Sequence, residues 1–281
     1  MKKYRLCAFA DEAAKDLDGQ IRAMRENGID LLEMRGVDGT NVLDLTDEQV
    51  KTAAEKLRAA DISVWSLGSP LGKTDIHDNF DAEREHCKRL LEIADKTGAK
   101  CLRLFSFYGT GGEAVYRDEV MERLSRFAEL ARGSGVILCH ENEKGIYGDV
   151  ADRCLDIARS VPEIKAVFDP ANYVQCGEDT LRAFSLLAPY TYYGHIKDAL
   201  PDGRVVPPGQ GMGHLAEYLP KLLQNGETVL TLEPHLTKFV GLAKLEQAGE
   251  RSAVGEWHFA TPREAFDYAV NSLKAILENI H

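Results

Sequence analysis

The chain alternates eight times between a short apolar run and a longer stretch with helical spacing. The short runs are rich in residues that favour strands, and they cover residues 4–9, 31–34, 62–67, 101–107, 136–139, 165–168, 191–196 and 228–232. Strict alternation of strands and helices favours a parallel sheet, because parallel strands need crossover helices. Eight units favour closure of that sheet into a (β/α)8 TIM barrel, a fold of about 250 residues.

The stretches between the runs carry apolar residues at the spacing of one helix face. Val50, Ala53, Ala54 and Leu57 are an example. An open doubly wound sheet is the alternative, but no GxGxxG follows the first run and no GxxxxGK[ST] is present. We therefore predict one (β/α)8 domain over residues 1–281. The longest irregular part, about 235–260, is predicted to be an extended loop or lid over the active site.

Composition excludes several classes of protein. The net charge of −11 argues against a broad nucleic-acid-binding surface, because an acidic surface repels phosphates. No run approaches the ~20 apolar residues that span a bilayer. Asp11 and Glu12 interrupt the N-terminal region too early for a signal peptide, so we expect a cytoplasmic protein without a membrane partner. The six cysteines include no CxxC and are predicted to be buried thiols.

Ionisable side chains follow the last four predicted strands. They are Glu141, Asp169, His195 and Glu233. The carboxyl ends of barrel strands form one rim, so these side chains should converge there. Three carboxylates close together repel one another, and a divalent cation offsets that repulsion. Oxygen ligands with one imidazole suit Mn²⁺, Mg²⁺, Co²⁺ or Zn²⁺.

Each of these residues also has a structural interpretation. A single Asp or Glu after a strand is often a helix cap or a surface charge, and His195 could be a satisfied core histidine. A metal-capable side chain at the end of each of four consecutive strands favours a metal site. Glu143 has the same strand parity as Glu141 and is the competing ligand; Glu141 is preferred because it is nearer the strand.

Several motifs resemble those of a known family. They are His140-Glu141-Asn142, Asp169-Pro170-Ala171-Asn172, His195-Ile196-Lys197-Asp198, Leu232-Glu233-Pro234, Gly68-Ser69-Pro70-Leu71-Gly72-Lys73 and Pro208-Gly209-Gln210-Gly211. On these residues the whole chain resembles the xylose isomerase-like (β/α)8 proteins, the sugar phosphate isomerase/epimerase family. The resemblance is specific for fold and metal site, and much less so for substrate.

The resemblance implies that Glu141, Asp169, His195 and Glu233 hold one divalent metal ion, with manganese or zinc favoured. It also implies that Glu141 and Glu233 are the catalytic acid/base pair. Asn172 stands where many members carry a histidine, and Gln210 where a glutamate is common. Because of the first departure, the exact substrate of the ketose epimerases is not carried over to this chain. Related barrels associate, so a homodimer or homotetramer is expected.

The chemistry agrees with such a site. A proton beside a sugar carbonyl is weakly acidic, and a metal on the carbonyl and hydroxyl oxygens stabilises the enediolate that its removal creates. One base that returns the proton to the neighbouring carbon isomerises the sugar; two bases on opposite faces epimerise it. We therefore predict a metal-dependent isomerase or epimerase in carbohydrate metabolism, acting on a small sugar or sugar derivative.

Five further residues are candidate substrate contacts. They are Glu33, Lys73, Asn172, Lys197 and His235. Three of them also have a structural explanation. Lys73 could be a solvated loop lysine, Lys197 could pair with Asp198 or Glu233, and Glu33 could pair with Arg35. Arg103 is a candidate buried partner for a carboxylate at a strand end, and the sequence does not decide its role.

Three other functions use the same fold. A dehydratase of a keto-polyol or inositol would enolise its substrate and then expel a β-hydroxyl. An endonuclease acting at abasic sites would need a zinc cluster with extra ligands on strands 2 to 4, where this chain has Leu67 and Phe105. A non-catalytic sugar-binding barrel would not need the full ligand set.

Overall fold

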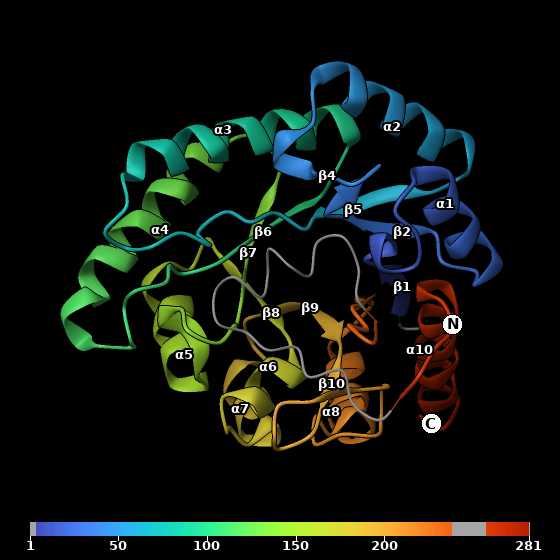
Figure 1. Ribbon diagram of the computed structural model, residues 1–281. Helices are drawn as coiled ribbons and strands as arrows, with labels where there is room; N and C mark the ends of the chain where they lie inside the picture. The colour runs from blue at the N-terminus through green and yellow to red at the C-terminus, as the bar shows by residue number, and fades with distance from the viewer. Residues whose placement is uncertain (1–3, 238–256, 281) are drawn as a thin grey trace.

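Eight parallel strands form a closed ring in the computed structural model, which describes residues 4–237 and 257–280. The strands bond in the order β1, β2, β5, β6, β7, β8, β9, β12 and back to β1 (Figure 1). Their bounds are β1 Tyr4–Ala8, β2 Leu31–Met34, β5 Ser63–Leu67, β6 Cys101–Leu104, β7 Ile137–Glu141, β8 Lys165–Phe168, β9 Thr191–Ile196 and β12 Thr228–Leu232. The eight predicted runs each contain one of these strands, so the (β/α)8 prediction is confirmed.

Helices follow every strand and surround the barrel (Figure 1). Their bounds are α1 Leu17–Glu26, α2 Asp47–Ala59, α3 Phe80–Thr97, α4 Arg117–Ala131, α5 Ala151–Ser160, α6 Pro170–Gln175, α7 Thr180–Leu187, α8 Leu215–Leu222 and α10 Pro262–Glu278. The predicted helical spacing explains how they pack. In α2, Val50, Ala53 and Leu57 are buried, so one apolar face lies on the strands.

The barrel interior has two layers of different chemistry. The lower layer is apolar and is formed by Cys7, Leu31, Cys101, Cys139, Val167, Tyr193 and Val229. Because side chains alternate along a strand, a residue two positions later points into the barrel one layer higher. By this rule Glu33 lies one layer above Leu31, Arg103 above Cys101 and Glu141 above Cys139. The polar layer therefore lies directly above a closed apolar floor, which keeps bulk water from reaching it from below.

Two short hairpins extend the carboxyl end of the barrel and were not predicted. β3 (Gly36–Val37) pairs with β4 (Thr40–Asn41), and β10 (Asp198–Ala199) pairs with β11 (Val205–Val206). Each consists of two-residue strands, which are too short to show an alternating pattern in the sequence.

The predicted fourth strand, residues 101–107, was too long. β6 ends at Leu104, because the next amides turn to a neighbouring loop: Phe105 N–H donates to Leu71 O and Phe107 N–H to Gly72 O. Phe107 also adopts a positive φ of 66°, which no strand residue has. Apolar alternation in this segment reflects burial beneath the loop rather than pairing in the sheet.

Most of the predicted lid falls outside the described residues, since only 235–237 and 257–260 of it are placed. Trp257 and Phe259 pack against Tyr268 of α10. Five of the six cysteines are buried thiols, as predicted. None of the described helices combines the length and the apolar character that crossing a bilayer requires.

Candidate metal centre

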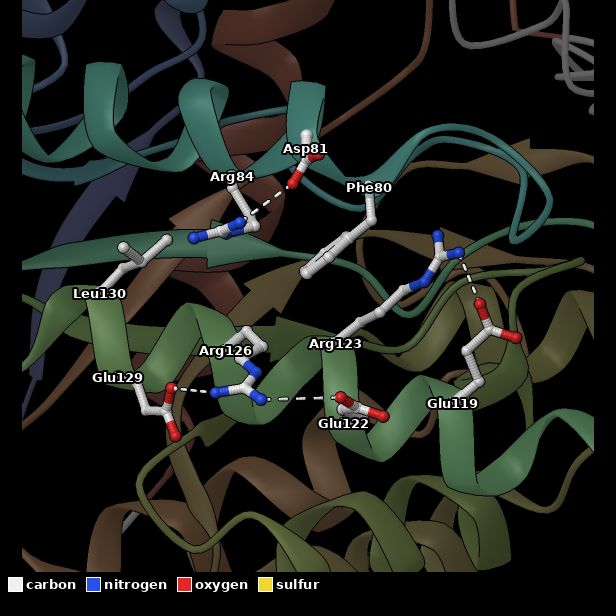
Figure 2. A pocket seen from close by; sticks show the side chains of 9 residues that line it. All are labelled: Phe80, Asp81, Arg84, Glu119, Glu122, Arg123, Arg126, Glu129 and Leu130. Atoms are coloured by element: carbon white, nitrogen blue, oxygen red, sulfur yellow. Dashed lines mark hydrogen bonds and ion pairs between the residues drawn. The ribbon is translucent and has the colours of Figure 1, made fainter.

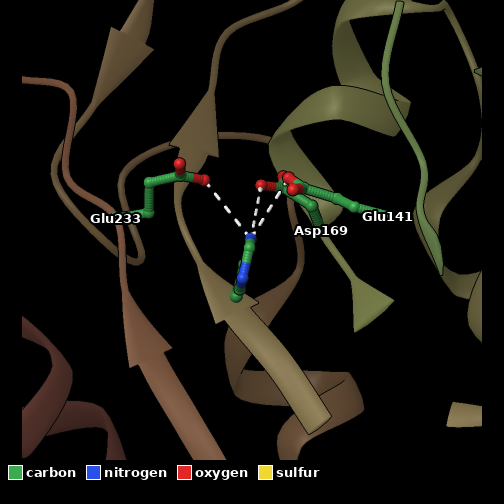
Figure 3. A group of neighbouring side chains, drawn as sticks. Glu141, Asp169 and Glu233 are labelled. Carbon is green, nitrogen blue, oxygen red and sulfur yellow. Dashed lines mark hydrogen bonds and ion pairs between the residues drawn. The ribbon is translucent and has the colours of Figure 1, made fainter. Parts of the chain in front are cut away.

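Four side chains converge at the carboxyl end of the barrel. Glu141 closes β7, Asp169 follows β8, His195 lies in β9 and Glu233 follows β12. One ligand atom of each lies within 4.8 Å of the others, and all four side chains are buried. Figure 3 shows the carboxylate of Glu233 on one side of this centre and those of Glu141 and Asp169 on the other.

One nitrogen of His195 faces all three carboxylates. Its Nδ1 lies 3.1 Å from Glu141 Oε1, 3.3 Å from Glu233 Oε2 and 3.8 Å from Asp169 Oδ2. The ring itself is held by edge-to-face contacts with Phe9 and Tyr193. The donor atoms therefore point at a common centre from four different strands.

The dimensions of this cluster fit a divalent cation. Ligands about 2.1 Å from an ion are at most roughly 4.2 Å apart, so only a small contraction of the cluster is needed. Glu141 Oε2 and Asp169 Oδ2 are buried and accept no hydrogen bond from any described residue, although ion pairs reach both. Three carboxylates and one imidazole are the donor set that Mn²⁺, Mg²⁺ or Zn²⁺ takes in proteins.

Two cationic side chains, Arg103 and Lys197, contact these carboxylates. Arg103 Nη1 lies 3.0 Å from Glu141 Oε2, and its guanidinium lies over the rings of Phe9 and Phe105. Lys197 Nζ lies 3.0 Å from Asp169 Oδ2 and 3.2 Å from Glu233 Oε2. These contacts offset the repulsion among the carboxylates, and without them the buried negative charge would be strongly destabilising.

Burial and neighbouring charge act in opposite directions on the acids. Burial favours the neutral form of Glu141, but the charges of His195 and Arg103 outweigh it and lower the pKa of Glu141 to about 2. For Asp169, burial outweighs the attraction of Lys197 and raises its pKa to about 6. Burial also opposes ionisation of Glu233, but Lys197 and His235 hold the pKa of that carboxyl well below its usual range.

A second group of possible ligands adjoins the first and shares Glu233. Glu12, Glu233 and His235 also bring ligand atoms within 4.8 Å of one another. Arg35 lies among them, with Nη2 3.1 Å from Glu12 Oε1 and Nη1 3.1 Å from Glu233 Oε1. The guanidinium supplies the positive charge there that a second cation would otherwise bring.

Four of the five candidate substrate contacts lie against the cluster. Lys197 contacts Asp169 and Glu233, while Asn172 Nδ2 donates to Glu141 Oε1 over 3.3 Å. His235 Nε2 lies 3.5 Å from Glu233 Oε1. Glu33 lies against the opposite edge of the His195 ring, with Oε2 3.3 Å from Nε2.

Lys73, the fifth, lies outside the cluster and pairs with Glu143. Its ammonium contacts Glu143 Oε1 over 2.6 Å, and Tyr108 Oη donates to the same oxygen over 2.8 Å. Lys73 also lies over the ring of Phe105, 4.3 Å from its centroid. The structure thus separates the two glutamates at the carboxyl end of β7, since Glu141 joins the cluster and Glu143 joins this ion pair.

Asp198 has a different environment from the predicted pairing with Lys197. Its Oδ2 accepts hydrogen bonds from the amides of Gly209 and Gly211, and its Oδ1 from those of Ala199 and Gly213. The carboxylate therefore fixes the glycine-rich loop after β11. A Cβ at Gly211 would lie 2.3 Å from Asp198 Oδ1, so that position requires glycine.

Sequence reasoning missed the roles of Arg35 and Glu12 and left that of Arg103 open. Arg103 could have been found from strand parity, because it lies two residues after Cys101 of the apolar floor. Arg35 directly follows β2, and Glu12 ends the short 3-10 helix η1 (Ala10–Glu12) after β1, so strand parity gives no direction for either. Their contact with residues after β12 joins parts of the chain about 200 residues apart, as the Arg35–Glu233 separation of 198 shows.

A surface concavity between α3 and α4 offers no comparable convergence of groups. Its lining includes Phe80, Arg84, Arg123, Arg126 and Leu130 (Figure 2). Each of these arginines pairs with an acid on its own helix: Arg84 with Asp81, Arg123 with Glu119, and Arg126 with Glu122 and Glu129. The charges are already neutralised locally, so the barrel cluster is the stronger candidate for a functional site.

Comparison with solved structures supports the fold. The chain resembles D-allulose 3-epimerase from Methylomonas sp., with 16% identity and a TM-score of 0.76 over 99% of this chain and 98% of that chain. It resembles the probable 3-DHS dehydratase AsbF of Bacillus anthracis, with 18% identity and a TM-score of 0.73 over 100% of both chains. It also resembles the IOLI protein with a bound zinc atom, with 16% identity and a TM-score of 0.72 over 99% of both chains.

No curated protein sequence matches the chain. The family model for the xylose isomerase-like TIM barrel matches residues 21–278. That match covers nearly all of the barrel, including the four clustered side chains. The predicted resemblance is therefore confirmed: the chain belongs to the xylose isomerase-like TIM barrel family.

Proposed function

We propose that this protein is a divalent-metal-dependent isomerase or epimerase of a small sugar or sugar derivative. Glu141, Asp169, His195 and Glu233 would hold the ion, with Mn²⁺ or Zn²⁺ favoured. The observation that carries the proposal is the placement of two glutamates on opposite sides of one buried centre (Figure 3). Such a pair can remove a proton from one face of a carbon and return one to the other.

The chain's own residues provide the proton transfer. Glu141 would act as base or acid on one face of the substrate and Glu233 on the other. A divalent ion in the cluster supplies electrostatic stabilisation of the negative charge that develops on oxygen. Arg103, within 4 Å of both glutamates, keeps each carboxylate in place between proton transfers.

Substrate hydroxyls would be bound by residues around the cluster. Lys197 and His235 lie against Glu233, and Asn172 lies against Glu141. An amide at position 172 donates and accepts hydrogen bonds but does not ionise, so it suits a hydroxyl group rather than a proton-transfer step. Lys73, fixed by Glu143 and Tyr108, would contact the part of the substrate farthest from the ion.

The test is a panel of sugars, ketoses and keto-inositols incubated with chelated protein and with protein reloaded with Mn²⁺. The proposal predicts that the reloaded protein converts a panel member to a product of equal mass, with solvent deuterium at the carbon beside the carbonyl. Loss of water would identify a dehydratase instead. Stoichiometric metal uptake without any turnover would favour a sugar-binding barrel.

The variants Glu141→Gln and Glu233→Gln separate the two roles of the glutamates. Each should reduce turnover by at least about 100-fold, the range seen when a general acid or base is removed. Metal occupancy is measured in the same samples, so that loss of the ion is not mistaken for loss of the base. Full turnover in both variants would show the acid/base assignment to be wrong.

A further inference from the structure

Glu33 lies on the opposite edge of the His195 ring from the metal cluster. Its Oε2 is 3.3 Å from His195 Nε2, while His195 Nδ1 faces the three carboxylates. Both residues are completely buried. This contact was not expected from the sequence, where Glu33 was a candidate for binding sugar hydroxyls or pairing with Arg35.

Two hydroxyl groups donate to one oxygen of the Glu33 carboxylate. Tyr193 Oη donates to Oε1 over 2.8 Å and Ser66 Oγ donates to the same oxygen over 3.2 Å. With both hydroxyls on Oε1, Oε2 is directed at the imidazole. Glu33 is therefore fixed from below by the barrel wall and presents one oxygen to His195.

We propose that Glu33 is a positioning residue that keeps the single proton of neutral His195 on Nε2, so that Nδ1 is free to ligate the metal ion. A histidine that ligates a metal must be neutral, with its lone pair on the ligating nitrogen. An acceptor is needed on the other nitrogen to fix that tautomer, and a carboxylate is a common one.

The need for such a residue follows from the surroundings of Nδ1. Glu141 Oε1 and Glu233 Oε2 lie 3.1 Å and 3.3 Å from it, and both are acceptors. Without a competing acceptor at Nε2, the proton of a neutral ring would be drawn to Nδ1. That tautomer cannot bind a cation through Nδ1, so the four-residue cluster would lose its only nitrogen ligand.

The variant Glu33→Gln tests the idea with almost no change in volume. The hydroxyls of Tyr193 and Ser66 keep the amide oxygen on their side, which places the NH₂ group opposite Nε2. An NH₂ group donates a hydrogen bond there and favours the tautomer with its proton on Nδ1. Glu33→Met removes the acceptor altogether, and Glu33→Asp keeps the charge but shortens its reach.

The control is Glu83→Gln. Glu83 is also a buried glutamate beside a histidine, with Oε1 2.8 Å from His86 Nδ1 and Oε2 accepting from Gly72 N–H. It lies on α3, away from the cluster. It therefore measures the effect of neutralising a buried glutamate without touching His195.

The measurement is the affinity for Zn²⁺ and Mn²⁺, obtained by competition with a chelator, with thermal unfolding of the metal-free proteins recorded alongside. We expect Glu33→Gln and Glu33→Met to weaken binding by about 10- to 100-fold, the usual cost of losing such a partner. Glu33→Asp should be intermediate and Glu83→Gln unchanged. Folded Glu33→Gln protein that binds both ions within twofold of wild type would overturn the proposal.

Nitrogen-15 NMR spectra of the zinc-loaded wild-type protein show which nitrogen of His195 carries the proton, even if the variants fail to fold. They should show a proton on Nε2 of His195 and the metal on Nδ1; ligation through Nε2 would overturn the proposal. The inference rests on the proposed metal site. Wild-type protein that takes up no ion would refute that site, whereas wild-type binding with unchanged affinity in Glu33→Gln would refute this inference alone.

Discussion

Arg103 Nη1 lies 3.0 Å from Glu141 Oε2 and 3.7 Å from Glu233 Oε1, so one buried guanidinium contacts both glutamates of the centre. Because breaking a buried ion pair leaves an uncompensated charge, Arg103→Met should destabilise the metal-free protein by about 3–5 kcal/mol. A divalent ion should restore part of this loss, since it supplies the missing positive charge.

Urea unfolding of wild type and Arg103→Met, each with and without Mn²⁺, measures both effects. The matched control is Arg126→Met, which removes an exposed arginine from the helix pairs of α4. Its effect should be below about 1 kcal/mol. Equal stabilisation of wild type and Arg103→Met by the ion would contradict the charge argument.

Glu141 and Glu143, at the carboxyl end of β7, should differ in their effect on metal binding. Glu141→Gln removes a charged ligand and should weaken the affinity for Mn²⁺ by at least about 100-fold. Glu143→Gln should leave it within about twofold, because Glu143 pairs with Lys73 and Tyr108 instead. Titration calorimetry on both variants checks this. If Glu143→Gln lost the ion and Glu141→Gln kept it, the ligand assignment would be reversed.

The Asp198 carboxylate should be important for stability. Each of its oxygens accepts two backbone N–H groups, so in Asp198→Asn the amide NH₂ faces two donors in either orientation. Since an unsatisfied buried donor costs about 1–3 kcal/mol, we expect a loss of about 2–4 kcal/mol in the free energy of unfolding. Asp202→Asn, exposed in the same hairpin, is the control and should cost less than about 1 kcal/mol. A loss in Asp198→Asn no larger than in the control would contradict the loop assignment.

The ion pair between Arg117 and Asp156 should make part of the stability depend on pH. Hydrogen bonds from Arg117 and Tyr147 lower the pKa of Asp156 in the folded protein, against a partly opposing effect of burial. The unfolded chain, with an ordinary pKa of about 3.9, then binds more protons as the pH falls. The contribution of Asp156 is therefore complete at neutral pH and is lost as the pH falls below about 4.

Comparison of wild type with Asp156→Asn at two pH values checks that sign. At pH 7 the variant should be less stable by about 1 kcal/mol, a value reduced for the partial exposure of the pair. At about pH 3 the difference should shrink, because the wild-type carboxyl is then increasingly neutral as well. A difference that stayed constant or grew on acidification would exclude the carboxylate as its source.

The barrel and the convergence of Glu141, Asp169, His195 and Glu233 could be predicted because both depend on local patterns. Each strand has its own apolar run, and a side chain at its carboxyl end must reach the common rim. The partners of these four side chains depend instead on contacts between segments that are distant in the sequence. Arg35 meets Glu233 and Glu12 meets His235 only after the ring has closed. The periodicity of the sequence does not predict those contacts.

Two other features of the structure differ from the sequence prediction for physical reasons. The run 101–107 is apolar beyond Leu104 because a loop covers Phe105 and Phe107. Burial under that loop gives the same apolar sequence pattern as a strand. Glu33 was a plausible sugar ligand from its place at a strand end. Strand parity places both Glu33 and His195 in the polar layer, but it does not say which side chains of that layer meet across the barrel.

The most direct test of the account is the metal itself. Chelated protein is reloaded with Mn²⁺, its metal content is measured per chain, and crystals are used to locate the ion by anomalous scattering. The account predicts one ion per chain, ligated by Glu141, Asp169, His195 and Glu233. Reloaded protein that retains no ion, or that binds it away from these four side chains, would contradict it.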